Sequence, residues 1–337
     1  NYNPDDNLIF KIGAPNIVMG TAETLYPTVE ADGSFTINIP LYHHTQVRMM
    51  IGNADLVILL SPEKETNVAI NLSNPPGKQF VFSGQYATIN NEWCQPELIT
   101  KIPPVYSDGD LLDSIVGISA NEFKKRCINQ YKRYVTHNSA QLQFSEDTRT
   151  LANLSCAFDC LENLQATHYC LQTAYQKKEN ITREQAFAAF LDVYLPDDFH
   201  NYLKDFPVNH PLALYCYNYR NVVMDLYDTH KDPLAYEKNL LKNAPLTKEE
   251  QTLIHQYETA FKAGISFQQE SELMALSAKY FKENDQFRWE SFSKAKERLS
   301  NIIQDSTSLI VDYIRAIYMR SSFYNLQPLT PRQELMA

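Results

Sequence analysis

The chain has 337 residues, 44% apolar and 21% charged, so it is long enough for two or three domains and too rich in core-forming residues to be disordered. Its 30 basic and 40 acidic residues give a net charge of −10, which argues against a nucleic-acid-binding protein, because phosphate recognition needs clustered lysine and arginine. No apolar run approaches the roughly 18–20 residues that cross a bilayer.

Glycine content and side-chain alternation predict β-strands in the first third of the chain. Seven of the nine glycines precede residue 110, as is typical of short strands joined by turns. Residues 34–39 alternate polar and apolar side chains after an Asp-Gly turn signal, and the apolar runs 47–51 and 56–60 flank a Gly-Asn hairpin signal. Further strands are expected over 8–12, 16–19, 67–72 and 80–82. With no helical pattern between them, these strands predict an antiparallel β-sandwich.

The rest of the chain is predicted to be helical. The tetrapeptides Ser-Ala-Asn-Glu (119–122) and Thr-Lys-Glu-Glu (247–250) are capping boxes, which mark helix starts. Apolar side chains recur every three or four residues from Leu151 to Tyr175, so we expect one helix over 146–178 with a buried stripe. Other helices are expected over 119–135, 183–194, 196–205, 210–228, 247–261, 267–282 and 297–321.

The charge balance changes where the glycine content changes. Residues 1–110 hold 5 basic and 12 acidic groups, a balance of −7, whereas the remainder holds 25 and 28, a balance of −3. We therefore place a boundary after the stiff Ile-Pro-Pro sequence at 102–104. The predicted fold class is α+β multidomain, with an N-terminal antiparallel β-sandwich domain over 1–104 and an all-α helical domain over 105–337.

The six cysteines form no C-x-x-C pair. Cys156 and Cys160 lie four residues apart on one helix face, where a disulfide would be strained and a metal would need two further ligands. We interpret them as small buried groups at a helix contact, and we extend that interpretation to Cys127, Cys170 and Cys216. Cys94, beside a tryptophan, is expected to lie nearest the surface.

The chain offers no catalytic constellation. Its eight histidines are scattered, and the adjacent His43 and His44 should face opposite sides of a strand end, so they cannot readily share a metal. Nucleophile-elbow, dinucleotide-binding and Walker motifs do not occur, and acidic pairs such as Asp197-Asp198 lie at expected helix starts. We assign no catalytic residue, no metal ligand and no cofactor.

Tyrosine is abundant, with 21 residues, and two interpretations of it stay open. Tyr202, Tyr215 and Tyr219 lie near one another in sequence, and the last two should share a helix face. Such rings either fill the seams between helices or line a groove that binds glycan or peptide.

Several stretches carry a family resemblance in chain order. The stretch F-V-F-S-G-Q-Y-A-T-I-N-N-E-W (80–93) resembles the F-S-G-x-Y-A-x-L-N-x-E segment of TlpA-type thiol–disulfide oxidoreductases, a thioredoxin-like family, and is the most specific match. E-A-D-G-S-F-T-I-N-I-P (30–40) and L-L-S-P-E-K-E-T-N-V-A-I-N-L (59–72) are similar to strands of the same β-sandwich domain, although Glu63-Lys64 stand where the family usually has glycine. G-I-S-A-N-E-F-K-K-R (117–126) and D-F-P-V-N-H-P-L-A-L-Y-C-Y-N-Y (205–219) resemble parts of its helical domain.

The resemblance implies a periplasmic or cell-envelope protein, often a lipoprotein with its anchor upstream of residue 1. In this family the two domains precede a thioredoxin-like domain, whose redox-active W-C-x-x-C is absent from this chain, so no catalytic residue carries over. The chain would then be the non-catalytic N-terminal portion of a thiol–disulfide oxidoreductase. It would position its own thioredoxin-like domain or a partner protein, and it would not bind nucleic acid. The alternative is a free-standing cell-envelope module that binds glycan or peptide on a Tyr-rich helical face.

Overall fold

A computed structural model describes most of the chain and groups it into two compact units. The first unit comprises residues 1–103, 129–159 and 209–220, and the second comprises 104–128, 160–208 and 221–337. The predicted Ile-Pro-Pro link and the start of the helix expected from 196 lie outside the described residues. Those residues are 9–18, 20–95, 113–138, 143–190, 199–216, 218–227, 241, 244–263, 265, 267–283, 285–305 and 307–324.

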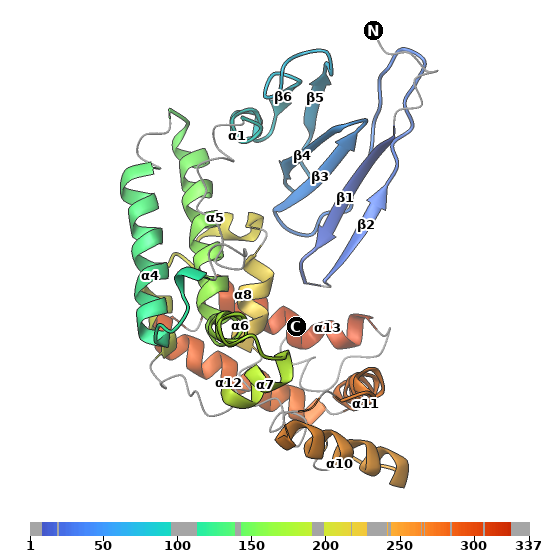
Figure 1. Ribbon diagram of the computed structural model, residues 1–337. Helices are drawn as coiled ribbons and strands as arrows, with labels where there is room; N and C mark the ends of the chain where they lie inside the picture. Colours follow the sequence, from blue (N-terminus) through green and yellow to red (C-terminus); the bar gives the residue numbers. More distant parts are fainter. Residues whose placement is uncertain are drawn as a thin grey trace. The chain divides into compact units, whose positions relative to one another are not determined.

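Antiparallel strands form the N-terminal part, as predicted. Four of them make a sheet in the order β2-β1-β3-β4, with the bounds β1 Phe10–Asn16, β2 Thr21–Leu25, β3 Thr45–Ile51 and β4 Ala54–Leu60 (Figure 1). The predicted hairpin joins β3 to β4, and Gly52 adopts a φ of +57° in the two-residue turn between the paired Ile51 and Ala54. A positive φ costs glycine little, because it has no Cβ.

A second antiparallel sheet pairs β5 (Thr66–Ile70) with β6 (Phe80–Gly84). Side chains from both sheets join one hydrophobic cluster. Its buried members are Phe10, Ile12, Val47, Met49, Leu56, Ile58, Phe80 and Phe82. These residues alternate with more exposed ones along their strands, which is why period-two patterns located most of the strands.

Two expected strands are wrong. Residues 34–39 form no ladder beyond a single bridge between Val29 and Phe35, although Phe35, Ile37 and Ile39 do pack against the core cluster. The alternation of polar and apolar side chains over 34–39 therefore indicates an extended backbone with one buried face. Such a segment can bury that face without pairing to a neighbouring strand. Residues 16–18 end β1 and turn toward β2 instead of forming a strand of their own, and the rest of that expected strand lies outside the described part.

Helices make up the described chain from residue 113 onward. The α-helices are α4 (Ala120–Arg133), α5 (Glu146–Gln165), α6 (Thr167–Glu179), α7 (Arg183–Phe190), α8 (Tyr219–Tyr227), α10 (Lys248–Ala263), α11 (Glu270–Glu283), α12 (Asp285–Ile303) and α13 (Leu309–Tyr324). A π-helical turn, η2 (Tyr134–Asn138), follows α4, and two 3₁₀ helices are η4 (Phe199–Asp205) and η5 (Pro211–Tyr215). One short helix, α1 (Ala87–Trp93), follows directly after the strands and was not predicted.

The long helix predicted over 146–178 is two helices. Its stripe is buried as expected at Leu151, Leu154, Phe158, Leu161 and Leu164. The break comes at Ala166, where the hydroxyl of Thr167 donates a 2.6 Å hydrogen bond to the carbonyl of Leu164. The predictions over 210–228 and 297–321 also each cover two helices, η5 with α8 and the end of α12 with α13.

Candidate functional site

The structure places the three tyrosines proposed as binding residues in the core. Tyr202 in η4 is 2% exposed, Tyr215 at the end of η5 is 1% exposed, and Tyr219 at the start of α8 is fully buried. Tyr215 and Tyr219 lie in different helices, so the expectation that they share one helix face is wrong. Rings this deeply buried contact a ligand only if their neighbours move.

Tyr215 belongs to an aromatic cluster with His44 and Tyr86, all within the first unit. Its hydroxyl lies 3.2 Å from Nδ1 of His44, and its ring centroid lies 5.5 Å from His44 and 5.8 Å from Tyr86. Burial raises the pKa of Tyr215, and a hydrogen bond with Tyr86 raises it further. The cluster therefore joins η5 to the start of β3 and to the start of α1.

A sharp bend between β6 and α1 positions Tyr86. Gly84 has a φ of +87°, and a Cβ atom there would lie 2.8 Å from the carbonyl oxygen of Glu65, so only glycine fits. Tyr86 itself is left-handed, with a φ of +57°, as the residue that precedes α1. This costs energy for a non-glycine residue, so the surrounding contacts must hold it in place.

Two consecutive asparagines on α1 bind the backbones of both sheets. Oδ1 of the fully buried Asn90 accepts from the N–H of Leu59 at 2.7 Å, and its Nδ2 donates to the carbonyl of Leu59 at 3.0 Å. Asn91 makes the same pair of bonds with Phe82, at 2.8 and 3.0 Å. Each amide side chain takes the place of a neighbouring strand, one beside β4 and the other beside β6. We call this pair the asparagine clip.

The next residue of α1 holds the start of α5. The carboxylate of Glu92 accepts two 3.0 Å bonds from the N–H of Ser145 and a 2.6 Å bond from its hydroxyl. Ser145 precedes the first residue of α5, where a carboxylate also interacts favourably with the helix dipole. Stretch 80–93 thus fixes three backbone segments, and it meets stretch 205–219 where Tyr86 contacts Tyr215.

In the second unit, Tyr202 lies beside a lysine that serves a packing role. Nζ of Lys124 donates a 2.8 Å bond to the carbonyl of Phe199 and lies 4.9 Å from the Phe199 ring and 5.5 Å from the Tyr202 ring. A cation over two aromatic faces is stabilised by the ring quadrupoles. The lysine therefore fastens η4 to α4.

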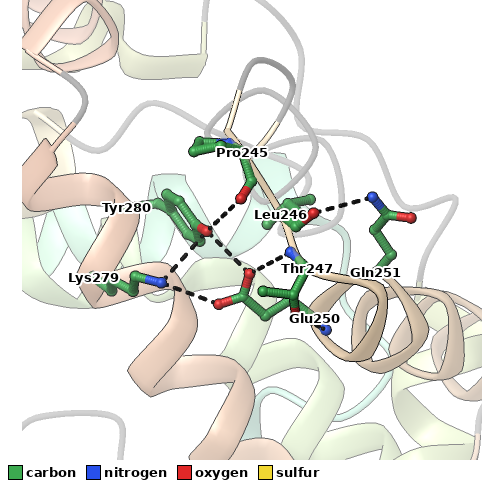
Figure 2. Close-up of polar contacts among 7 residues, drawn as sticks. All are labelled: Pro245, Leu246, Thr247, Glu250, Gln251, Lys279 and Tyr280. Carbon is green, nitrogen blue, oxygen red and sulfur yellow. Dashed lines mark hydrogen bonds and ion pairs between the residues drawn. The ribbon is translucent and has the colours of Figure 1, made fainter.

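A second polar cluster joins α10 to α11 (Figure 2). The predicted capping box forms in full, since Thr247 N–H donates to Glu250 Oε2 at 2.8 Å and Glu250 N–H donates to Thr247 Oγ1 at 3.2 Å. The hydroxyl of Tyr280 donates to Oε2 of Glu250 at 3.0 Å, and Nζ of Lys279 donates to Oε1 at 3.2 Å. Every polar group in this cluster serves a helix start or a helix contact.

All six cysteines are free thiols, and five are buried. The exception is Cys94, as predicted. Burial raises the pKa of Cys94 and Cys170 to about 11 and that of Cys127, Cys156 and Cys216 to about 12. Because the thiolate is the nucleophile in disulfide exchange, the five thiols with a raised pKa are poorly suited to attack a disulfide at neutral pH.

The described residues hold no cluster of three or more His, Cys, Asp or Glu side chains with the geometry to bind a metal ion. None of the helices in the described ranges is both long and apolar enough to cross a membrane.

No protein-family model, curated protein or solved structure matches this chain significantly. The sequence analysis missed the Tyr86 cluster and the asparagine clip; Tyr86, Asn90 and Asn91 entered it only as residues of the 80–93 resemblance, with no role assigned.

Proposed function

We propose that this chain is the non-catalytic N-terminal portion of a cell-envelope thiol–disulfide oxidoreductase. In this proposal it positions a thioredoxin-like domain, or that domain's partner protein, and takes no part in thiol chemistry itself. The proposal includes the finer architecture expected from the resemblance, in which the two sheets form a β-sandwich domain over 1–104 and a helical domain occupies 105–337.

The state of the cysteines is the observation that carries this proposal. A redox-active thiol needs an accessible position, a lowered pKa and a resolving thiol nearby. Here five of the six thiols are buried, and the one partly accessible thiol, Cys94, has a raised pKa. Redox chemistry at a C-x-x-C pair would therefore have to come from outside this chain.

The use of buried polar groups gives further support. Three consecutive side chains of α1 bind backbone groups of other segments in the same unit: Asn90 binds β4, Asn91 binds β6, and Glu92 binds Ser145. These hydrogen bonds join α1 to the two sheets and to the start of α5. A catalytic or binding site keeps some polar groups directed at a substrate, whereas these groups are saturated by the protein itself. Such saturation suits a framework that holds other parts in position.

The alternative of a glycan- or peptide-binding module loses its main support. It depended on exposed rings at Tyr202, Tyr215 and Tyr219, and at most 2% of each of these residues is exposed. The large exposed apolar residues include Tyr26 and Tyr42, but these lie beyond opposite ends of the four-stranded sheet, as the pairing of β1, β2 and β3 requires.

The test is to determine the coding sequence that follows Ala337 and to express the longer protein. We expect a further domain of roughly 100–150 residues that contains W-C-x-x-C. The longer protein should reduce insulin with dithiothreitol, and Cys→Ser changes in that motif should abolish the activity while Cys94→Ser leaves it unchanged.

The 337-residue chain is the matched control and should not exceed the dithiothreitol blank. A coding sequence that stops after Ala337, or continues without W-C-x-x-C, would contradict the proposal. So would insulin turnover by the 337-residue chain that disappears when one of its own cysteines is changed.

A further inference from the structure

Residues 34–41 form an extended segment of the first unit that has the side-chain pattern of a strand and no ladder partner in the described part of the chain. Its polar side chains and Pro40 are exposed. The half-buried side chains that alternate with them and pack against the hydrophobic cluster of the two sheets are Phe35, Ile37, Ile39 and Leu41. The ring of Phe35 lies edge to face on the ring of Phe10, 4.7 Å away. The core thus holds this backbone extended without help from a neighbouring strand.

One edge of this segment has free backbone groups. A single antiparallel bridge joins Phe35 to Val29, and the N–H of Glu30 donates to the carbonyl of Ser34 at 2.8 Å. Along an antiparallel strand, residues that bond to the neighbour alternate with residues whose N–H and C=O point away from it. Because Ser34 bonds toward Glu30, residues 35, 37 and 39 direct these groups to the opposite side. Among the described residues, none forms a hydrogen bond with the backbone of these three.

The free edge lacks the features that keep other strands away. Proteins protect an open edge with charged side chains, or with proline at a position where a bond would form. Residues 34–41 contain no charged residue. Pro40 follows the alternation of Ser34, so its missing N–H belongs to the side that faces Val29 and removes no bond from the free edge. Nothing in the segment itself therefore opposes pairing.

The order of the side chains makes the segment complementary to itself. In an antiparallel pair centred on Ile37, the Ile37 residues of two copies face each other and Phe35 of each copy faces Ile39 of the other. On the exposed side, Thr36 of each copy faces Asn38 of the other. All the free N–H and C=O groups then bond reciprocally. A shift of one residue would instead set apolar side chains against polar ones, so the pattern favours this register.

We propose that residues 34–41 are a self-association edge, on which a second copy of this chain docks by antiparallel pairing of the same segment. The contact is the same patch on both copies, so it closes at a dimer. Pairing along one short segment buries less than the roughly 1,200–2,000 Å² of a stable interface, so the dimer is weak, with a Kd of about 10–100 µM.

Sedimentation velocity of the 337-residue chain tests this over a range of about 1–500 µM, which spans the expected Kd. The sedimentation coefficient should rise from that of a monomer toward that of a dimer and no further. Amide hydrogen exchange at the two ends of this range locates the contact. Peptides covering 34–41 should gain protection with concentration, whereas peptides of the exposed helix α10 should not.

Two double variants test the register, because Thr36 and Asn38 are exposed and face each other across the pair. The Cα atoms of such a non-hydrogen-bonded pair are about 4.5 Å apart. Thr36→Lys with Asn38→Lys places like charges opposite each other and should raise the Kd about tenfold. Thr36→Glu with Asn38→Lys places opposite charges there and should leave the Kd equal or lower.

The matched control is Thr252→Lys with Gln256→Lys, which adds the same two charges to an exposed face of α10. Its Kd should stay within about twofold of that of the unmodified chain. Since two added lysines reduce the net charge of −10, they weaken general repulsion between copies, so a loss of dimer in the Thr36 and Asn38 variant points to the edge itself. Circular dichroism checks that each variant is folded.

Four results would overturn the proposal. The first is a chain that stays monomeric over the whole concentration range. The second is growth beyond a dimer, which indicates general aggregation. The third is full protection of 34–41 in the monomer, which means that another part of the same chain pairs with this edge. The fourth is a folded double-lysine variant that dimerises as well as the unmodified chain. The first three use the unmodified chain, so they decide the matter even if a variant does not fold.

Discussion

Replacement of Asn90 by alanine should destabilise the first unit severely. The change removes both hydrogen bonds to Leu59, a residue that is itself fully buried, so its N–H and carbonyl lose their partners where water cannot reach them. Each buried backbone group left without a partner costs about 1–3 kcal/mol, so the pair should cost about 2–6 kcal/mol. For a unit with ordinary marginal stability, this is a large share of the total.

Fluorescence can report this unit alone, because the chain has two tryptophans, Trp93 in the first unit and Trp289 in the second. In a Trp289→Phe background, urea denaturation followed at Trp93 gives the free energy of unfolding of the first unit. Asn91→Ala is the matched control. It removes two bonds of the same kind from Phe82, but Asn91 is partly exposed and water can replace them, so the cost should be about 1 kcal/mol.

A further variant separates the two bonds. Asn90→Asp keeps an acceptor for the N–H of Leu59 but places a carboxylate oxygen beside the Leu59 carbonyl, so it should be no more stable than Asn90→Ala. The reasoning is refuted if Asn90→Ala unfolds within about 1 kcal/mol of the unmodified chain, or if Asn90→Ala and Asn91→Ala have the same midpoint.

Three other outcomes are expected. Phe158→Ala should cost about 3–5 kcal/mol by the same denaturation assay, since the ring is buried against Tyr219 in the same unit, and a midpoint equal to that of the unmodified chain would contradict this. Thiol titration with DTNB should find at most Cys94 reactive in the folded chain and six thiols in denaturant, and a second rapidly reacting native thiol would be inconsistent with the burial. The backbone N–H of Thr247, with Lys279 and Tyr280, lowers the pKa of Glu250 in the folded chain. The Glu250 carboxylate therefore stabilises the α10–α11 contact fully above about pH 4.5, and this stabilisation is lost as the pH falls through the lower pKa of the folded state. Glu250→Gln should remove this part of the acid sensitivity, measured at Trp289 in a Trp93→Phe background.

Local signals predicted the parts of the fold that depend on local chemistry. The hairpin at Gly52, the capping box at Thr247 and the buried stripe through Leu161 each follow from a few neighbouring residues, and each is present. Helix breaks were harder, because the apolar periodicity continues across Ala166 although the helix does not. The 34–39 segment shows the same limit, since alternation does not reveal whether a partner strand exists.

The joints of the first unit could not be predicted from periodicity. Tyr215 and His44 are 171 residues apart in sequence, and Asn90 and Leu59 are 31 residues apart. No pattern within a window of 10–20 residues records such pairs. Tyr215 was singled out because tyrosines are frequent around it, and its neighbours turned out to be a histidine and a second tyrosine from the β-rich part of the chain.

The asparagine clip also bears on whether the edge of β4 is open to another molecule. β4 is an edge strand, and its sequence, Ala-Asp-Leu-Val-Ile-Leu-Leu, is rich in β-branched and aliphatic residues. An open edge of that composition invites the strand of another molecule, which is the first step toward aggregation. Asn90 occupies the backbone groups of Leu59 that such a strand would use. Loss of this one side chain weakens the hold of α1 on β4, and wherever α1 comes away the edge of β4 is open to intermolecular pairing, so variants at Asn90 should aggregate more readily than the unmodified chain.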